Sequence, residues 1–487
     1  MFSPRFLLCL LLTARFAFAA PSPKSAPPAE LHLTLRKAIA LAIENNLAIK
    51  VGEFEPDIAA ARITSELGAF DPALRAYANR NVFNSASGEN DYGAYGLGLG
   101  GKSVYGTDYQ LGLATTGGSN SRFPNLYSSG AQFALTQPLL RGFGSDVNLA
   151  ALRIARNNRQ ISEWAFKQEI IDVVTQTVFV YNELYSALRN YEAARHSRDL
   201  ALELCKQEET RAEIGVKIEL DVVTAQAEAA SREEAVILAK NDIENNERYL
   251  KQLITSDTEK LLAMRISIEP PPIAAIGGVD LPAGLRAALG ERPDYRQALI
   301  SLQTRHINVV TARNSALPRL DLVGSLNLIG LDSNDISESL SFWNNRGGNP
   351  QNWSIGTVFS LPIPNRGARG QLKAARLIDA QALIGLKQLE QSIIVNVANA
   401  AGQIETARKR IDSTQEALRL AKESLDAGRK RHEFGSATTF EVLQLQKAMT
   451  DAQAALIRAE ADYHKAISEY DRQTGQTLRQ NGIEVSN

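Results

Sequence analysis

The side chains that most often carry enzyme chemistry are scattered in this sequence rather than grouped. The five histidines show neither an HExxH motif nor the paired spacing of metal ligands. The run Gly96-Leu97-Gly98-Leu99-Gly100-Gly101 has the glycine content of a phosphate-binding loop, but it continues into another strand pattern and not into a helix. The sequence also contains no nucleophile elbow and no Cys/His pair. It therefore predicts a protein that is not an enzyme and that needs no cofactor and no metal.

Two carboxylates stand out because each follows a glycine at the same point of a repeated pattern. Asp221 lies six residues after Gly215, and Glu441 lies six residues after Gly435, 220 residues further along the chain. Symmetry-related carboxylates near an axis would repel one another and attract cations, so they could bias a gate or select cations. The alternative for both is a solvated residue at the start of a helix, where the helix dipole stabilises an acidic side chain.

The elements that would position these carboxylates also occur twice. Pro138 and Pro362 each end a strand-like segment, and they lie 224 residues apart. Each half contains a helix, alternating segments, a very long helix, a glycine-marked turn and a return helix. Such internal repetition indicates a tandem duplication, which we place at roughly 31–255 and 280–475.

The helices of the two halves follow from their apolar patterns. The first helices are expected at about 31–68 and 283–314, and the long ones at about 145–213 and 368–433. The long helices contain no proline and would each span roughly 100 Å at 1.5 Å per residue. Apolar residues on the return helix of the second half recur every three or four residues, which predicts coiled-coil packing: Leu445, Met449, Ala452, Leu456, Ala459, Tyr463, Ala466 and Tyr470.

Alternating segments of about ten residues predict strands with one apolar face. Four lie in the first half, near 73–83, 92–102, 106–116 and 129–138, and two lie in the second half, from Arg319 to Gly330 and around Phe359. Such strands suit a transmembrane barrel or a soluble sandwich. The long helices favour the barrel, since a sandwich has no use for rods of that length. One chain offers too few strands for a wide barrel, and lipid cannot satisfy a free edge, so several chains must share it.

The first residues predict export. Arg5 precedes an apolar run, and Ala17-Phe18-Ala19 matches a signal-peptidase site, so residues 1–19 are expected to be a signal peptide. The mature chain would keep one cysteine, Cys205, which excludes an intrachain disulfide. No later stretch is apolar enough for a transmembrane helix. A formal net charge of −1 without a basic block argues against nucleic-acid binding.

The order of these parts resembles the outer-membrane efflux protein family of TolC-like channels. The resemblance covers about 440 residues and includes the run Gln137-Pro138-Leu139-Leu140-Arg141-Gly142 after a strand. It implies a mainly α protein with β strands, in which a shared transmembrane β-barrel continues into an α-helical coiled-coil barrel. It further implies a homotrimer with twelve strands and twelve tunnel helices. Such a trimer would be the exit duct of a tripartite efflux pump or a type I secretion system.

The resemblance also implies partners and site residues. The partners would be outer-membrane lipid, a periplasmic adaptor protein and an inner-membrane efflux transporter or ABC exporter. The tunnel would close at Asp221 and Glu441, as a periplasmic gate, and the adaptor would dock at the two tips. The sequence has Gln444 where some members have a second acid, and Ala437 where some have a latching arginine, although Lys217 holds the matching place in the first half. The expected docking residues are Gly215, Val216, Lys217, Gly435, Ser436 and Ala437.

A further departure is the uneven number of strands in the two halves. The extra pair in the first half either forms a hairpin outside the barrel or makes the barrel larger than usual. The proline-rich segments, Pro21 to Pro28 and Glu269 to Pro272, cannot continue a helix and are expected to form a belt around the middle of the tunnel with the linker and tail. The expected division is a signal peptide at 1–19, a first repeat at 20–255, an equatorial linker at 256–282, a second repeat at 283–475 and a C-terminal tail at 476–487.

Three functions are compatible with these sequence features. An efflux or secretion duct in the outer membrane, with a large periplasmic portion, accounts for the leader, duplication, strands and rods together. A porin-like uptake channel accounts for the strands but gives the long helices no role. A structural periplasmic coiled-coil spacer would make the strands incidental.

Overall fold

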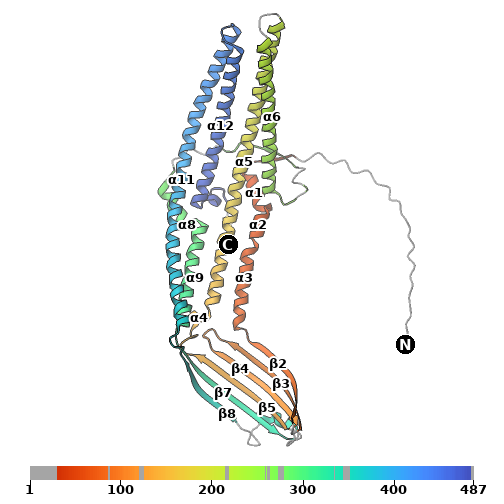
Figure 1. The fold of residues 1–487 in the computed structure, drawn as a ribbon, viewed down its shortest axis with the longest axis vertical. Coiled ribbons are helices and arrows are strands. Elements are labelled where there is room, and N and C mark those ends of the chain that lie inside the picture. Colours follow the sequence, from red (N-terminus) through yellow and green to blue (C-terminus); the bar gives the residue numbers. More distant parts are fainter. Residues whose placement is uncertain are drawn as a thin grey trace, which may run out of the picture.

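The chain forms long helices that stand on one curved β-sheet (Figure 1). The computed structural model describes residues 30–85, 88–119, 126–213, 219–257, 259, 264–272, 279–333, 335–343 and 351–483. The predicted signal peptide and the segment from Pro21 to Pro28 lie outside these residues. Within them, no helix combines the length and the apolar character needed to cross a bilayer.

All the predicted strands join one antiparallel sheet. Its six strands follow the order β2-β3-β4-β5-β7-β8. The sequence alternation predicted each strand to within a few residues, because one apolar face with a period of two is a strong strand signal. The bounds are β2 Ala73–Ser85, β3 Gly88–Lys102, β4 Asp108–Ser119, β5 Leu126–Pro138, β7 Arg319–Asp332 and β8 Gln351–Ser360.

The sheet order decides where the extra strand pair of the first half belongs. β3 and β4 pair with each other and lie between β2 and β5, so they are inside the sheet and not a separate hairpin. β5 then pairs directly with β7 of the second half, as in the register Phe133↔Leu326. The twelve-stranded barrel implied by the resemblance would need four strands from each of three chains. The sheet of this chain contains six strands, two more than that number.

Each half contains a long helix that is flanked along its length by shorter ones. α5 (Ala150–Glu213) follows the short α4 (Ser145–Asn148), and α11 (Arg366–Glu433) is the longest helix. Their 64 and 68 residues correspond to roughly 100 Å each. The return helices α6 (Glu219–Ile254) and α12 (Thr439–Thr474) pair with the half of each long helix that lies away from the sheet (Figure 1).

The half of each long helix near the sheet is covered by the first helices of each repeat, and these are broken where we expected continuous helices. Asn46 separates α1 from α2, because its side chain caps α2 by accepting from the Ala48 amide at 2.8 Å. α9 begins at Pro293, because a proline disfavours helical geometry in the residue before it, here Arg292. The elements are α1 Leu35–Asn45, α2 Leu47–Gly52, α3 Phe54–Leu67, the 3₁₀ turn η1 Gly68–Phe70, α8 Leu281–Glu291 and α9 Pro293–Ser315.

The main core lies midway along the rods and contains the middle of α5. There, Tyr181 and neighbouring aliphatic side chains contact α1, α6 and the two-stranded parallel sheet of β1 (Glu30–Leu33) and β6 (Arg265–Ile268). α13 (Thr477–Gln480), in the predicted tail, adds Leu478 to the same core. The described parts of the linker and tail thus lie at this level of the rods. Residues 260–263, 273–278 and 484–487 lie outside the described chain.

The predicted coiled-coil stripe of α12 is confirmed. Met449, Ala459, Tyr463 and Ala466 are buried, and the other members of the stripe are partly buried against the same clusters. The structure assigns this stripe to helix packing. It thereby holds the turn between α11 and α12 at the end of the rod that is far from the sheet.

Candidate functional site

The turn between α11 and α12 contains three of the residues predicted to dock a partner. Gly435 has φ of 71°, which a glycine adopts without strain. Its amide donates to the His432 carbonyl at 3.0 Å, and the Ser436 amide donates to the Arg431 carbonyl at 2.8 Å, the pattern of a Schellman helix end. The Arg431 guanidinium also donates to the Ser436 carbonyl at 3.0 Å. The backbone of the turn is therefore held in one shape, while Ser436 is exposed and Ala437 half-buried.

Glu441 has a structural role at the start of α12. Its amide donates to the Thr438 hydroxyl at 3.2 Å, and its carboxylate accepts from the Thr438 amide at 2.9 Å. This reciprocal pair is a capping box, which satisfies amides that the first turn leaves unpaired. The side chain is exposed, so the carboxylate also remains open to solvent. The helix-start role considered from the sequence is therefore present, and it does not conflict with a second role facing a pore.

The corresponding turn of the first half is described only in part. Gly215, Val216 and Lys217 lie outside the described residues. Asp221 is the third residue of α6 and is half-buried near the start of that helix. The two predicted gate carboxylates therefore occupy the first turns of the two return helices, at the same end of the rods (Figure 1).

A buried polar cluster beside these turns escaped the sequence analysis. Glu208 of α5 is fully buried, and its carboxylate lies 3.3 Å from His432 Nε2 and accepts from the Thr439 hydroxyl at 3.2 Å. The Arg211 guanidinium lies 3.3 Å from the same carboxylate. These contacts join the long helix of the first half to the helical turn of the second. If the two hairpins shifted apart, the buried Glu208 carboxylate would lose its partners on the other hairpin, which is costly. The cluster therefore stabilises the observed placement of the two hairpins against each other.

A signal for Glu208 was present in the sequence. Ser197, Ala201 and Leu204 mark the buried stripe of α5 at steps of three and four residues, and the next step is Glu208. A carboxylate on an apolar stripe predicts a buried partner. The identity of that partner could not be predicted, because His432 and Thr439 come from another repeat and no spacing relates them to Glu208.

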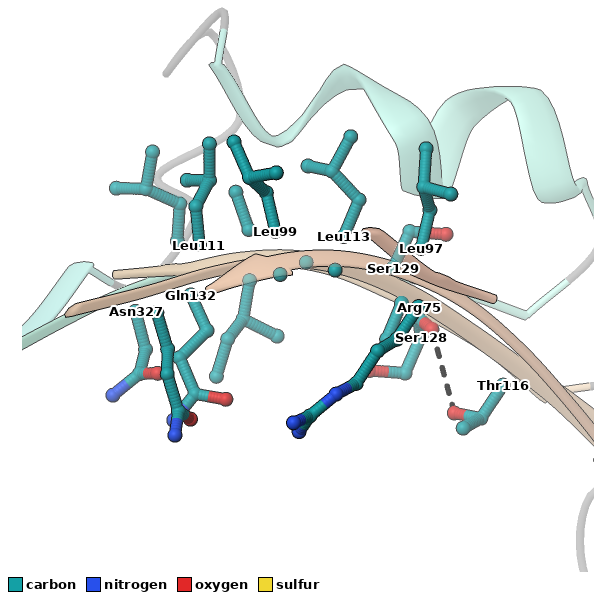
Figure 2. A pocket seen from close by; sticks show the side chains of 18 of the residues that line it. Arg75, Leu97, Leu99, Leu111, Leu113, Thr116, Ser128, Ser129, Gln132 and Asn327 are labelled. Atoms are coloured by element: carbon teal, nitrogen blue, oxygen red, sulfur yellow. Dashed lines mark hydrogen bonds between the residues drawn. The ribbon is translucent and has the colours of Figure 1, made fainter. Parts of the chain in front are cut away.

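At the opposite end of the molecule, one face of a single sheet is largely apolar, and the other is mixed, with polar side chains beside Tyr77 and Ile329. Figure 2 shows Leu97, Leu99, Leu111 and Leu113 on one face. The side chains that it labels on the other face are polar, namely Arg75, Thr116, Ser128, Gln132 and Asn327.

The leucine face of the sheet has little cover. Leu111 and Leu113 remain 48% exposed although they lie in the middle of the sheet. At the far end, α10 (Ile336–Ser339) and the 3₁₀ turn η2 (Leu340–Trp343) contact this face, where the Ser339 hydroxyl lies 2.7 Å from that of Ser129. A single-layer sheet with an open apolar face and a polar face suits a boundary between lipid and water.

The described residues contain no group of three or more His, Cys, Asp or Glu side chains that could bind a metal. The thiol of Cys205 in α5 is buried, and burial raises its pKa. A thiol of this kind is a packing residue, not a nucleophile.

The chain combines strands that have a lipid-compatible face with long helices of about 100 Å, an arrangement that suits a protein that extends from a membrane. The sequence profile of the outer membrane efflux protein family matches residues 38–256 and 284–475. The chain therefore belongs to the outer membrane efflux protein family, as the resemblance indicated, and the two matched stretches correspond to its two repeats.

Among characterised relatives, the chain is 25% identical over 359 residues to the outer membrane efflux protein BepC of Brucella suis biovar 1, covering 72% of this chain and 73% of the relative. It is 23% identical over 327 residues to the outer membrane protein TolC of Vibrio cholerae, covering 67% and 72%. A relative in Pseudomonas putida, 27% identical over 302 residues and covering 60% and 59%, is the solvent efflux pump outer membrane protein SrpC. The names of these relatives describe outer membrane and efflux proteins, not enzymes.

Solved structures share the fold over nearly the whole chain. The Campylobacter jejuni outer membrane channel CmeC superimposes with a TM-score of 0.69 at 19% identity, covering 91% of this chain and 86% of that one. The open state of the Neisseria gonorrhoeae channel MtrE gives 0.65 at 20% identity, covering 91% and 89%. At this identity the likeness establishes the fold alone.

Proposed function

We propose that this protein is the trimeric outer-membrane exit duct of a tripartite efflux pump or a type I secretion system. The observation that carries the proposal is that a sheet with one open apolar face continues directly into helices roughly 100 Å long. A barrel alone would cross the outer membrane. The rods extend the passage through the periplasm, where a pump in the inner membrane can reach it.

In this proposal the two faces of the sheet lie in different environments, one in lipid and the other in water. The face of Leu97, Leu99, Leu111 and Leu113 contacts lipid, and the face of Gln132 and Asn327 lines the aqueous passage. The strands, of 10 to 15 residues, are long enough to cross the hydrocarbon layer at the usual tilt.

Exposed apolar side chains on the helices support an assembly of several copies. A single rod pair in water would leave them uncovered, whereas neighbouring rods of a tunnel would bury them. They lie on α5, α6 and α11 and are 44–70% exposed: Leu202, Leu220, Val223, Ile237, Leu238, Leu377, Ile378, Leu383, Ile384, Ile394 and Val395. The number of three copies comes from the family resemblance.

The far ends of the rods would form the periplasmic gate and the docking surface. Asp221 and Glu441 from three copies would place six carboxylates near one axis, where they repel each other and favour cations. The adaptor would contact the turns that include Gly215 to Lys217 and Gly435 to Ala437. Since no nucleotide-binding motif was found in the sequence, the partners would supply the energy for transport.

A photo-crosslinking experiment tests this function. A photoreactive amino acid at Ala437, in cells that express the native pump, should capture a periplasmic adaptor. The same amino acid at Ala448, an exposed position further along α12, is the matched control and should capture much less. Cells without this protein should also accumulate an efflux dye. Normal dye export without the protein, together with no capture at Ala437, would favour a porin-like channel or a periplasmic spacer.

A further inference from the structure

The two outermost strands of the sheet have an edge without a neighbour in the described chain. β2 pairs only with β3, and β8 pairs only with β7, so each presents a row of backbone amides and carbonyls. In lipid every such group needs a hydrogen-bond partner from the protein, because the hydrocarbon layer contains no water to supply one. These edges therefore require further strands if the sheet is in the membrane.

The β8 edge lacks the features that protect edge strands in water, whereas β2 carries Arg75 and Arg80. Soluble proteins blunt such strands with charges, prolines or bulges. β8 contains no charged residue and no proline over its ten residues. On its apolar face Trp353 is 75% exposed and Ile355 is 68% exposed, whereas Leu111 on the same face of an inner strand is 48% exposed. Trp353 and Ile355 have a strand neighbour on one side only, and the neighbour of Ile355 is Gly324, whereas Leu111 lies between Leu99 and Phe133.

Both edges carry large apolar side chains on the apolar face. The register places Leu74 of β2 beside Leu99 on that face, and Trp353 of β8 lies there beside Leu326. Both edge side chains are largely exposed, so each edge leaves apolar surface that a neighbouring strand would cover.

The number of strands also suits pairing between copies. Because the sheet has six antiparallel strands, an even number, β2 and β8 run in opposite directions. Strand β8 of one chain can therefore join β2 of another as an antiparallel pair, and the same contact can be repeated around a ring. Within one chain the two strands lie at opposite edges of the sheet and do not pair.

We infer that β8 of each copy pairs with β2 of the next, and that each copy contributes all six of its strands to one barrel. This inference rests on the proposed trimer, for which it gives a barrel of 18 strands in place of the twelve implied by the resemblance. With strands about 4.8 Å apart and tilted by about 40°, 18 strands form a backbone cylinder roughly 36 Å across, and twelve form one roughly 24 Å across. The outer-membrane passage is therefore wide enough for a bulkier class of cargo.

The additional hairpin has several glycines on the polar face. There β3 presents Gly96, Gly98 and Gly100, and β4 presents Gly112. These glycines add almost no side-chain volume of their own. The ring of Tyr77 lies over Gly96, so part of the space above the hairpin is filled from β2.

Disulfide formation across the edge tests the pairing. In a Cys205→Ala background, Ile355→Cys is combined in turn with Leu74→Cys, Ala76→Cys and Ala78→Cys, and the assembled protein is oxidised. One combination should link the chains into a covalent ring of three on a denaturing gel. The control pair Thr115→Cys with Ser129→Cys faces across β4 and β5 of one chain, so it should form a disulfide without joining chains and report correct folding.

A second measurement tests the strand number directly. Deleting Gly88–Ser119 removes β3 and β4 and leaves β2 and β5 as antiparallel neighbours. Electron cryomicroscopy of the two purified proteins should show a barrel about 1.5-fold wider in the full chain than in the deletion variant. A trimer with equal barrel widths, or with no edge disulfide in any combination, would overturn the six-strand barrel while leaving the duct intact. A monomeric native mass would instead overturn the proposed function.

Discussion

Glu441 shows how one side chain can stabilise a helix and also serve a pore. Its carboxylate closes the capping box with Thr438, so replacing it by alanine removes both a helix cap and a charge. Glutamine keeps the cap, because its amide oxygen can accept the same hydrogen bond, but it has no charge. The two substitutions therefore separate the structural role from the electrostatic one.

We expect Glu441→Gln combined with Asp221→Asn to reduce cation selectivity or raise leak conductance in planar bilayers, since both carboxylate charges are lost while the helix start is retained. Glu441→Ala should in addition destabilise the start of α12 by about 0.5–1 kcal/mol. The matched control is Asp451→Asn, on the exposed side of α12 away from the turn. Bilayer currents of the double variant that match those of the wild type would contradict the gate assignment.

Asp471 near the end of α12 makes the stability of the fold depend on pH. Burial raises the pKa of its carboxyl from 3.8 to about 6. The folded state therefore takes up a proton at a higher pH than the unfolded state, and stability from this residue increases as the pH falls from about 6 to about 4. Above pH 6 the folded state bears the full cost of a buried charge.

We expect Asp471→Asn to raise the thermal midpoint at pH 7.5, by an amount equivalent to at most about 3 kcal/mol, and to have little effect at pH 4. Thermal unfolding of the detergent-extracted protein at the two pH values measures this. Asp451→Asn, which removes an exposed charge from the same helix, should not reproduce the difference. An equal shift at both pH values would mean that the substitution acts through packing and not through the buried charge.

At the scale of elements, Tyr181 connects three segments at the middle of the rods. The side chain is fully buried in α5, and its hydroxyl lies 3.0 Å from the Leu33 carbonyl oxygen and 2.7 Å from that of Glu269. Burial raises its pKa to about 12, so the hydroxyl keeps its proton and remains a donor at physiological pH. It holds β1 and the segment after β6 against the long helix.

We expect Tyr181→Phe to lower stability by about 1–2 kcal/mol, since it leaves buried carbonyl oxygens without this donor and keeps the packing of the ring. Limited proteolysis should cut the linker after β6 more rapidly in the variant. Tyr185→Phe, one helical turn further along α5, removes a hydroxyl that contacts Arg189 and is the control. Equal proteolysis of Tyr181→Phe and the wild type would show that packing alone holds the linker.

The elements of this fold differ in how well their sequences predict them. The six strands and the long helices were predicted closely, because alternation and proline-free apolar periodicity are local signals. The breaks at Asn46 and Pro293 were missed, although each has a local cause. Asn46 caps the helix that follows it, and Pro293 restricts the residue before it. The buried contact of Glu208 with His432 was beyond prediction because it joins two repeats.

At the scale of the whole molecule, the duplication is readable in the sequence and determines the architecture. Each repeat places one long helix between a sheet-side group of short helices and a return helix, and the two repeats meet where β5 pairs with β7. The sequence left open whether the additional strands lie inside the barrel wall, since alternation defines a strand but not its neighbours. The sheet order places them inside the sheet.

The most direct test of the duct is the native mass of the protein extracted in mild detergent from a purified outer-membrane fraction. An exit duct built from shared strands and neighbouring rods requires an assembly, so we expect a protein mass three times that of the mature chain. A monomer in that fraction would mean that one chain makes its own porin-like passage. Recovery from the soluble periplasm would mean a spacer, and either result would contradict the trimeric duct.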